Sequence, residues 1–286
     1  MDRTALGLIT IGHWLVDLSQ GVVIAILPFL IAAGELTYAA AGGLVFATSA
    51  ASSIVQPAFG HLADRLSSRW LLPASVLVTG LALSVGSLMS TYWLMAGLLS
   101  ISGLGVAAFH PEAARQARRA AGSQASTGMS IFAVGGGLGF AMAPLVTAGL
   151  FAVIGREGVA AILTPLTIAV AVLLAWRSRP VPVSSHGHSS LHTTAHGTNA
   201  WGAFTLLSLT VVARAIVFTG LNTFLASYWM VQYGVSAGEG SMTLGVFLGS
   251  GLAGTMIGGL VGDRIGHREG MRFGFVAAVL MLPVVL

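Results

Sequence analysis

Long apolar stretches separated by short polar breaks make up most of the 286-residue chain. A bilayer's hydrocarbon core is about 30 Å thick, and a helix needs roughly 20 apolar residues to cross it. A helix also satisfies its own backbone hydrogen bonds in lipid, and no alternating strand pattern is present. We therefore predict an all-α integral membrane protein with about nine transmembrane helices, over Leu6–Ala32, Ala39–Phe59, Leu71–Met89, Tyr92–Phe109, Gly128–Ile154, Val159–Trp176, Trp201–Val231, Thr243–Val261 and Phe273–Leu286.

The composition supports solvation by lipid. Hydrophobic residues make up 55% of the chain and charged residues only 8%, too few to cover the surface of a soluble domain. The first stretch is too long for the core of a signal peptide and is expected to remain as a span. Cysteine is absent, which excludes disulfides, thiolate metal sites and cysteine nucleophiles.

Arginine is concentrated on one side of the predicted spans. The chain has thirteen basic residues, all of them arginine, and eleven fall in alternate breaks on the side of the N-terminus: Arg3, Arg65, Arg69, Arg115, Arg118, Arg119, Arg177, Arg179, Arg264, Arg268 and Arg272. The opposite breaks hold Glu35, Arg156, Glu157 and Glu239. The positive-inside rule then predicts that this side, with the N-terminus, is cytoplasmic. We expect a multi-pass protein of the bacterial inner (plasma) membrane.

One long polar segment divides six predicted helices from three. Residues 177–200 are rich in Pro, Ser, Thr, Gly and His, which is typical of a flexible cytoplasmic linker. His188, His192 and His196 recur every four residues, a spacing that would suit a metal on a helix. The neighbouring Gly187 and Gly197 disfavour a helix, so we prefer the linker and expect no metal site and no cofactor.

A ten-residue pattern occurs twice with a constant offset of 199 residues, after the second span and after the eighth. Glycine allows close helix approach, aspartate can cap or face the next helix N-terminus, and arginine anchors at lipid headgroups. The repeat therefore predicts a pair of cytoplasmic latches with matching residues Gly60 and Gly259, Asp64 and Asp263, Arg65 and Arg264, and Arg69 and Arg268.

This pair of loops resembles the signature of the major facilitator superfamily, whose two six-helix halves are related by an axis along the membrane normal. The resemblance covers the whole chain and implies a major facilitator fold, with residues 1–176 as the N-terminal half and 177–200 as the linker. Residues 201–286 would be a truncated C-terminal half with helices seven, eight and part of nine. A complete member has about twelve spans, so roughly a hundred residues are expected after Leu286. We expect the 286-residue chain alone to transport nothing.

Within that superfamily, three segments are similar to the fosmidomycin resistance protein group of drug exporters: His13–Gln20 with Pro28, Gln56-Pro57 and Gly103–Glu112. The third continues downstream through Arg115, Arg118, Met129–Phe132, Gly135-Gly136 and Pro144. The sequence departs from this pattern at Gly137, where the group usually has asparagine, which can alter substrate choice. Leu99 stands where many proton-driven exporters carry arginine, which leaves proton coupling to other residues.

Asp17 is the only acidic residue inside a predicted span, and an ionisable group within a membrane is by default a functional candidate. His13 and Gln20 lie on the same helical face. Burial disfavours the charged forms of aspartate and histidine alike, so Asp17 and His13 can exchange a proton. The alternative is a helix-packing hydrogen bond without a role in turnover.

Arg214 is the other charge inside a span, and the repeat offset places it near the depth of Asp17. The resemblance implies that spans one and seven line the central cavity. We therefore expect Arg214 to pair with Asp17 until an anionic substrate arrives, with snorkelling to an interface as the alternative. Gln20 and Asn222 are the other cavity candidates.

His110 and Glu112 flank Pro111 at the end of the fourth span and complete the candidates for proton coupling. Proline disfavours helix at the preceding residue, so His110 is expected to mark a kink or the end of the span. Glu112 can pair with Arg115 one turn on, either as an interfacial cap or as a gate or secondary proton site.

These residues indicate a secondary active transporter for proton-coupled efflux of small drugs or metabolites by alternating access, with anions as candidate substrates. A proton-coupled uptake symporter for a sugar or carboxylate and a non-transporting membrane receptor or scaffold are the alternatives. An enzyme is disfavoured because no HExxH or Gly-x-Ser-x-Gly motif is present. The expected partners are a small-molecule substrate, protons and the lipid bilayer, and no nucleic acid. We expect the protein to be a monomer.

Overall fold

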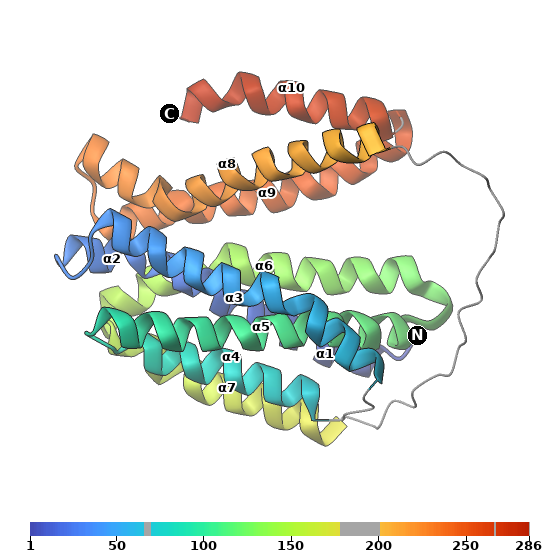
Figure 1. Cartoon of the computed structure of the whole chain (residues 1–286), viewed down its shortest axis with the longest axis horizontal. Coiled ribbons are helices and arrows are strands. Elements are labelled where there is room, and N and C mark those ends of the chain that lie inside the picture. The colour runs from blue at the N-terminus through green and yellow to red at the C-terminus, as the bar shows by residue number, and fades with distance from the viewer. Residues whose placement is uncertain (66–69, 178–200, 266, 286) are drawn as a thin grey trace.

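The helical prediction is confirmed by a computed structural model, which describes residues 1–65, 70–177, 201–265 and 267–285 (Figure 1). Side chains at 62–65 and 258–268, among others, lie outside this description. No strand occurs in the described ranges. The helices are α1 Arg3–Ala25, α2 Leu27–Ala32, α3 Tyr38–Arg65, α4 Leu71–Ser87, α5 Tyr92–Ala121, α6 Ala125–Val153, α7 Glu157–Arg177, α8 Trp201–Tyr233, α9 Ala237–Ile265 and α10 His267–Val285, with a 3₁₀ turn at Gly122–Gln124.

The helices have the lengths and apolar character that a multi-pass membrane protein requires. Six described segments are long and apolar enough to cross a bilayer: Arg3–Ala32, Tyr38–His61, Tyr92–Gln124, Thr127–Val153, Glu157–Arg177 and Phe204–Tyr233. Helix α4 is apolar but shorter. The first of these spans comprises α1 and α2, which are separated at Ile26 where Pro28 withholds a backbone donor.

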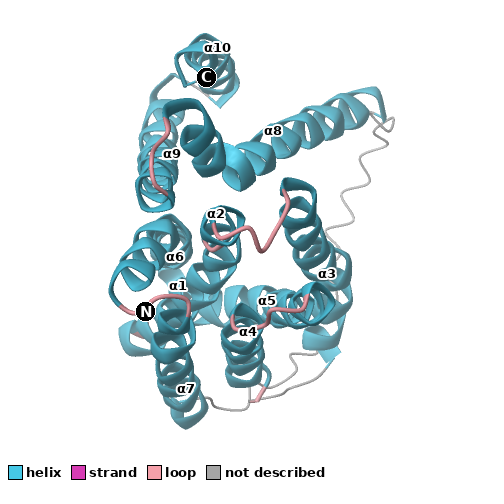
Figure 2. Ribbon diagram, turned by 90° about the vertical axis from the view of Figure 1, so that its left-hand side faces the viewer, coloured by secondary structure: helices cyan, strands magenta, loops and turns pink. Residues whose placement is uncertain are grey.

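Helices α1–α7 form one group and α8–α10 a second (Figure 2). In the first group α1 packs on α6 and α5, while α4 packs on α5 and α7. The group is built around a buried apolar cluster that includes Leu15, Val16, Leu99 and Phe109. The second group meets the first mainly where α9 packs on α6. The described architecture is therefore two helical bodies joined mainly along one helix pair, with smaller contacts of α2 and α3 with α8 and of α2 with α9.

Helix α5 continues through Pro111 to Ala121, so the helix does not end at His110, and the alternative of a kink there stays a prediction. Proline removes one backbone donor and disfavours helix at the residue before it. Here Ala113 and Ala117 beyond the proline are fully buried in the first group. Tertiary packing of the last turns therefore outweighs the local effect of the proline.

The helix ends that carry the arginines come together at one end of the molecule. The N-terminus, the junction of α5 with α6, and the C-terminal end of α7 lie on the right of Figure 1. The backbones of Gly60, Asp64 and Arg65 belong to the last two turns of α3, and those of Asp263 and Arg264 to the end of α9. Arg69 and the linker at 178–200 lie outside the described residues, as do the side chains of the repeated charged pattern, so the latch stays a prediction.

At the opposite end, Arg156 fastens three connections of the first group to one another. Its guanidinium donates from Nε to the carbonyl of Ser87 and from a terminal nitrogen to the carbonyl of Met89, at 2.6 Å for the latter. A second terminal nitrogen lies 2.5 Å from Oε2 of Glu35. One side chain thus joins the α2–α3, α4–α5 and α6–α7 connections, a set hereafter called the Arg156 clasp.

Helix α9 begins with a capping box. The backbone N–H and the hydroxyl of Ser236 each donate to Oε2 of Glu239 at 2.8 Å, and the Glu239 N–H donates back to the hydroxyl at 3.3 Å. The backbone hydrogen bond from Ser236, followed by that from its hydroxyl, holds the pKa of the Glu239 carboxyl below its ordinary value. This pairing explains why the short α8–α9 connection ends where it does.

Candidate functional site

The carboxylate of Asp17 lies between two imidazoles. Asp17 Oδ2 is 3.3 Å from Nε2 of His13, one turn earlier on α1. Asp17 Oδ1 is 3.3 Å from Nε2 of His110 on α5. The His13 and Asp17 side chains are 9% and 16% exposed and that of His110 is 28% exposed, so the group is largely enclosed but accessible at His110. We call these three residues the carboxylate cluster.

Both histidines are held in a defined tautomer. Nδ1 of His13 lies 2.8 Å from the carbonyl oxygen of Phe132, and Nδ1 of His110 lies 3.0 Å from that of Val106. A carbonyl oxygen only accepts hydrogen bonds, so each Nδ1 must carry the hydrogen. Each Nε2 of the neutral imidazoles therefore presents its lone pair to the carboxylate, and a proton or another cation is needed between them.

Helix α6 forms the wall of the carboxylate cluster. The Phe132 ring stacks on the His13 imidazole with centroids 4.0 Å apart and an interplanar angle of 17°. One turn later Gly136 leaves no space for a side chain, because a Cβ there would lie 2.4 Å from the imidazole and 2.5 Å from Asp17 Oδ2. The ring and the glycine together fix the position of His13 against Asp17.

Glu112, the fourth proton-coupling candidate, lies apart from the carboxylate cluster. Its Oε2 accepts hydrogen bonds from Arg115 at 2.9 and 2.6 Å, and its Oε1 accepts one from Gln116 at 2.7 Å. The Glu112 residue is 1% exposed. The predicted pairing with Arg115 is therefore present.

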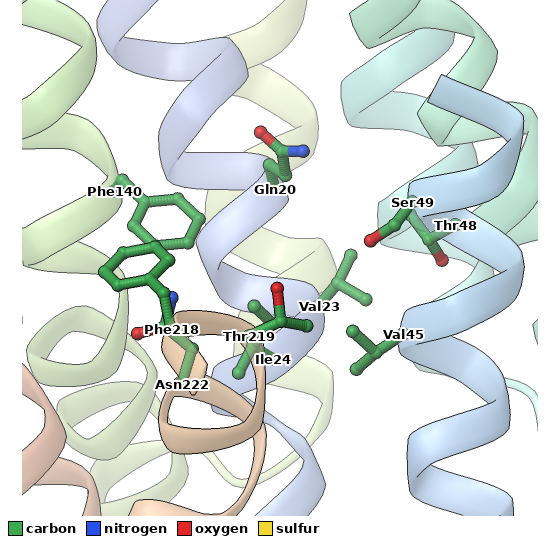
Figure 3. Close-up of a pocket in the computed structure, with 10 residues that line it drawn as sticks. All are labelled: Gln20, Val23, Ile24, Val45, Thr48, Ser49, Phe140, Phe218, Thr219 and Asn222. Carbon is green, nitrogen blue, oxygen red and sulfur yellow. The ribbon is translucent and has the colours of Figure 1, made fainter. Parts of the chain in front are cut away.

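A pocket of about 350 Å³ lies between the two helical groups (Figure 3). Helices α1, α3 and α6 supply one side and α8 the other. The pocket is lined by Gln20, Val23, Ile24, Val45, Thr48, Ser49, Phe140, Phe218, Thr219 and Asn222. Its polar groups are amides and hydroxyls, without a charged side chain among these ten. Two of the three predicted cavity residues, Gln20 and Asn222, thus line what we call the central pocket.

Arg214 does not line the central pocket, and its predicted ion pair with Asp17 is not formed. Arg214 is exposed on α8, and the described part of the chain offers it no ion pair. Helix α8 approaches the first group through α2 and α3 rather than through α1. The carboxylate of Asp17 is instead occupied by the two histidines.

Several site residues carry no distinctive signal in the sequence. Phe132, Phe140 and Phe218 are aromatic residues within apolar spans, where most such residues only fill space. The contribution of Phe132 to His13 is through a backbone carbonyl, which any residue type provides. A hydroxyl pair inside a span, Thr48-Ser49, is the one hint that could have indicated the lining of the pocket.

Comparisons with known proteins agree with this architecture. The Fosmidomycin resistance protein of Escherichia coli (strain K12) is 29% identical over 253 residues, which are 87% of this chain and 62% of that protein. The Uncharacterized MFS-type transporter YfnC of Bacillus subtilis (strain 168) is 34% identical over 166 residues, 58% of this chain and 40% of that protein. The chain therefore spans less than two thirds of the length of these relatives, and the predicted resemblance to the fosmidomycin resistance group is confirmed.

Solved structures show the same fold. A bacterial homolog to the human lysosomal transporter Spinster matches with a TM-score of 0.79 in its inward-facing, unoccupied conformation and 0.75 in its inward-facing, occupied conformation. The matches cover 93% and 92% of this chain and 64% and 62% of the other. Sequence identity is 20% in both cases, so the likeness concerns the fold alone.

The profile of the Major Facilitator Superfamily matches residues 9–286, nearly the whole chain. This match, the repeated charged pattern, the apolar helices and the fold agree with one another. The chain belongs to the Major Facilitator Superfamily.

Proposed function

We propose that this protein is a secondary active transporter of the bacterial inner membrane that exports small drugs or metabolites in exchange for protons. It works as a monomer, with its N-terminus and the arginine-bearing helix ends in the cytoplasm. The relative from Escherichia coli is called a fosmidomycin resistance protein, which supports export as the direction. The excess of arginine in the breaks on the side of the N-terminus supports the orientation.

One observation supports coupled transport most directly: the carboxylate cluster and the central pocket are adjacent on α1. Asp17 belongs to the first and Gln20 to the second. Three residues of helix correspond to a rise of about 4.5 Å. A proton that binds to or leaves the Asp17 carboxylate is therefore within one helical turn of a bound substrate. Exchange of substrate for protons requires this proximity.

Asp17, His13 and His110 are the proposed proton-coupling residues. The lone pairs on Nε2 of both histidines face the carboxylate, so a proton brought to the group is shared among the three side chains. The partial exposure of His110 provides the path by which it enters. Glu112 is not part of this proton-coupling group in the proposal, and its proposed role is the ion pair with Arg115.

The central pocket is proposed to bind the substrate. Asn222 is 3% exposed, and its Oδ1 has no hydrogen-bond partner in the described structure. An unpartnered buried amide costs free energy that a substrate's polar group recovers on binding. Phe140 and Phe218 supply the apolar faces. Arg214, exposed on α8, is proposed to attract anionic substrates rather than to pair with Asp17.

The test is substrate-driven proton flux in vesicles that contain the full-length protein. Export in exchange for protons moves protons against the direction of the substrate, whereas an uptake symporter moves both in the same direction. Asp17→Asn keeps the shape of the side chain and removes its proton site, so it is expected to abolish the flux. Symport, or an unchanged flux in Asp17→Asn, would contradict the proposal.

A further inference from the structure

We propose that the carboxylate cluster is also a binding site for a divalent transition metal ion of the Zn²⁺ type. No sequence pattern indicates this site, since His13 and Asp17 are nearly a hundred residues from His110 along the chain. The fold brings the three together, and their ligand atoms all lie within 4.8 Å of one another. The inference rests on this geometry and holds whichever ion drives transport.

The first argument is the direction of the lone pairs. Both Nδ1 atoms donate to backbone carbonyls, so both Nε2 atoms are free to coordinate, and both face Asp17. Metal-binding histidines in proteins almost always donate their other ring N–H to a carbonyl or carboxylate, which fixes the tautomer and orients the ring. The backbone carbonyls of Phe132 and Val106 already accept these hydrogen bonds.

The second argument is distance. Zn²⁺ lies about 2.1 Å from imidazole nitrogens and from carboxylate oxygens. An ion at that distance from both His13 Nε2 and Asp17 Oδ2, which are 3.3 Å apart, subtends an angle of about 104° between them, close to tetrahedral. The spacing from His110 Nε2 to Asp17 Oδ1 is also 3.3 Å and gives the same angle. The three ligand atoms lie within 4.8 Å of one another, so small shifts of the side chains suffice to bring them to one ion.

The third argument is an unsatisfied acceptor. Oδ1 of Asp17 is buried and makes no hydrogen bond in the described structure. An ionised carboxylate oxygen without a donor is costly within an apolar interior. A cation coordinated by this oxygen and by Nε2 of His110 removes that cost and the lone-pair repulsion together.

The ligand set selects the class of metal. Two imidazoles and one carboxylate suit Zn²⁺ and similar transition ions, whereas Mg²⁺ and Ca²⁺ prefer oxygen ligands alone. Three protein ligands leave a fourth tetrahedral position, as in sites where water or substrate completes the coordination. Because the His110 side chain is 28% exposed, a solvent molecule or an anionic group can reach the site to fill that position.

The test is metal binding by the full-length protein. It is purified with an affinity tag that contains no histidine, so that the tag itself binds no metal. The linker histidines are first replaced by alanine, His186, His188, His192 and His196 together, because they are rival ligands. Titration calorimetry with Zn²⁺ is expected to show one ion bound per chain. Co²⁺ is expected to show the intense visible absorption of a tetrahedral site, without thiolate bands, since none of the three ligands is a thiolate.

Two variants assign the site. Asp17→Asn and His110→Gln in that background are each expected to weaken Zn²⁺ binding about tenfold or more. The matched control is His61→Gln, an exposed histidine on α3, which should bind like its parent. Elution as a single species on size-exclusion chromatography confirms that the variants are folded.

The inference is overturned if the parent without linker histidines binds no Zn²⁺, or if both variants bind it as tightly as that parent. Because binding is measured without substrate or a proton gradient, this outcome is separate from the fate of the proposed function. A protein that exchanges substrate for protons but binds no metal refutes only the metal site. A protein that binds Zn²⁺ but moves no protons refutes only the exporter.

Discussion

Gly136 on α6 lies directly against Asp17 on α1, so closely that a Cβ at position 136 would be 2.5 Å from Oδ2 of the carboxylate. The same Cβ would meet Nε2 of His13 at 2.5 Å. The absence of a side chain at this position is therefore a condition for the contact between His13 and Asp17.

Gly136→Ala is expected to separate His13 from Asp17 and to lower substrate-driven proton flux about tenfold or more, since small displacements of reacting groups are costly. The control is Gly149→Ala on the same helix, where a Cβ meets nothing within 4 Å. Both changes favour helix formation by about 1 kcal/mol, so propensity cancels in the comparison. Equal flux in the two variants would show that the wall of α6 does not position the site.

The Arg156 clasp is expected to stabilise the first helical group. Arg156→Ala leaves the carbonyls of Ser87 and Met89 and the carboxylate of Glu35 without their shared donor. We expect a loss of about 2–3 kcal/mol, seen as a fall of several degrees in the apparent melting temperature in detergent. Glu35→Gln should cost less, because both carbonyl contacts remain.

A fitting comparison for the clasp is Arg272→Ala, which removes an exposed pair with Glu269 on α10. Exposed pairs contribute little to stability, about 0–1 kcal/mol. A melting temperature for Arg156→Ala as high as that of Arg272→Ala would argue against the clasp.

Glu112 is expected to act in stability rather than in proton coupling. Glu112→Gln leaves the Arg115 guanidinium without its counter-charge in a largely buried position, at a cost of about 3 kcal/mol. The pH dependence of transport should stay that of the parent. A shifted pH profile in Glu112→Gln with unchanged thermal stability would instead assign this residue to the proton path.

Arg214 is expected to affect substrate choice. Arg214→Ala should reduce export of anionic drugs and leave expression and the export of neutral compounds intact, whereas Arg214→Lys should keep most of both activities. Drug resistance of cells that express each variant measures the difference. Unchanged resistance to anionic drugs in Arg214→Ala would remove this residue from the proposal.

The architecture could be predicted well from the sequence because it depends on patterns that extend over many residues. The apolar stretches and the ten-residue pattern that recurs after 199 residues each involve many positions, so a local exception such as Pro111 does not change the predicted helices. The contact between His13 and Asp17 was also predictable, since both lie on one helical face. In contrast, the approach of His110 depends on how α5 packs against α1, and no local pattern reports that packing.

The error at Arg214 has a related cause. The repeat offset gave its depth along the helix but not the direction in which its side chain points around the axis. Depth follows from counting residues, whereas direction depends on which neighbours α8 meets, and these are α2 and α3. The role of Phe132 was beyond sequence analysis because its contact is made by the main chain.

The contact between α6 and α9 determines how the two helical groups can move. A Cβ at Gly137 would meet Leu252, and one at Gly245 would meet Leu145, so the two helices touch at small residues spread along their length. If one body turns about such a seam, the displacement is smallest at the seam and grows with distance from it. Because the 286-residue chain is free of cysteine, spectroscopic labels placed in pairs on the two bodies, away from α6 and α9, would report that angle without background from this chain.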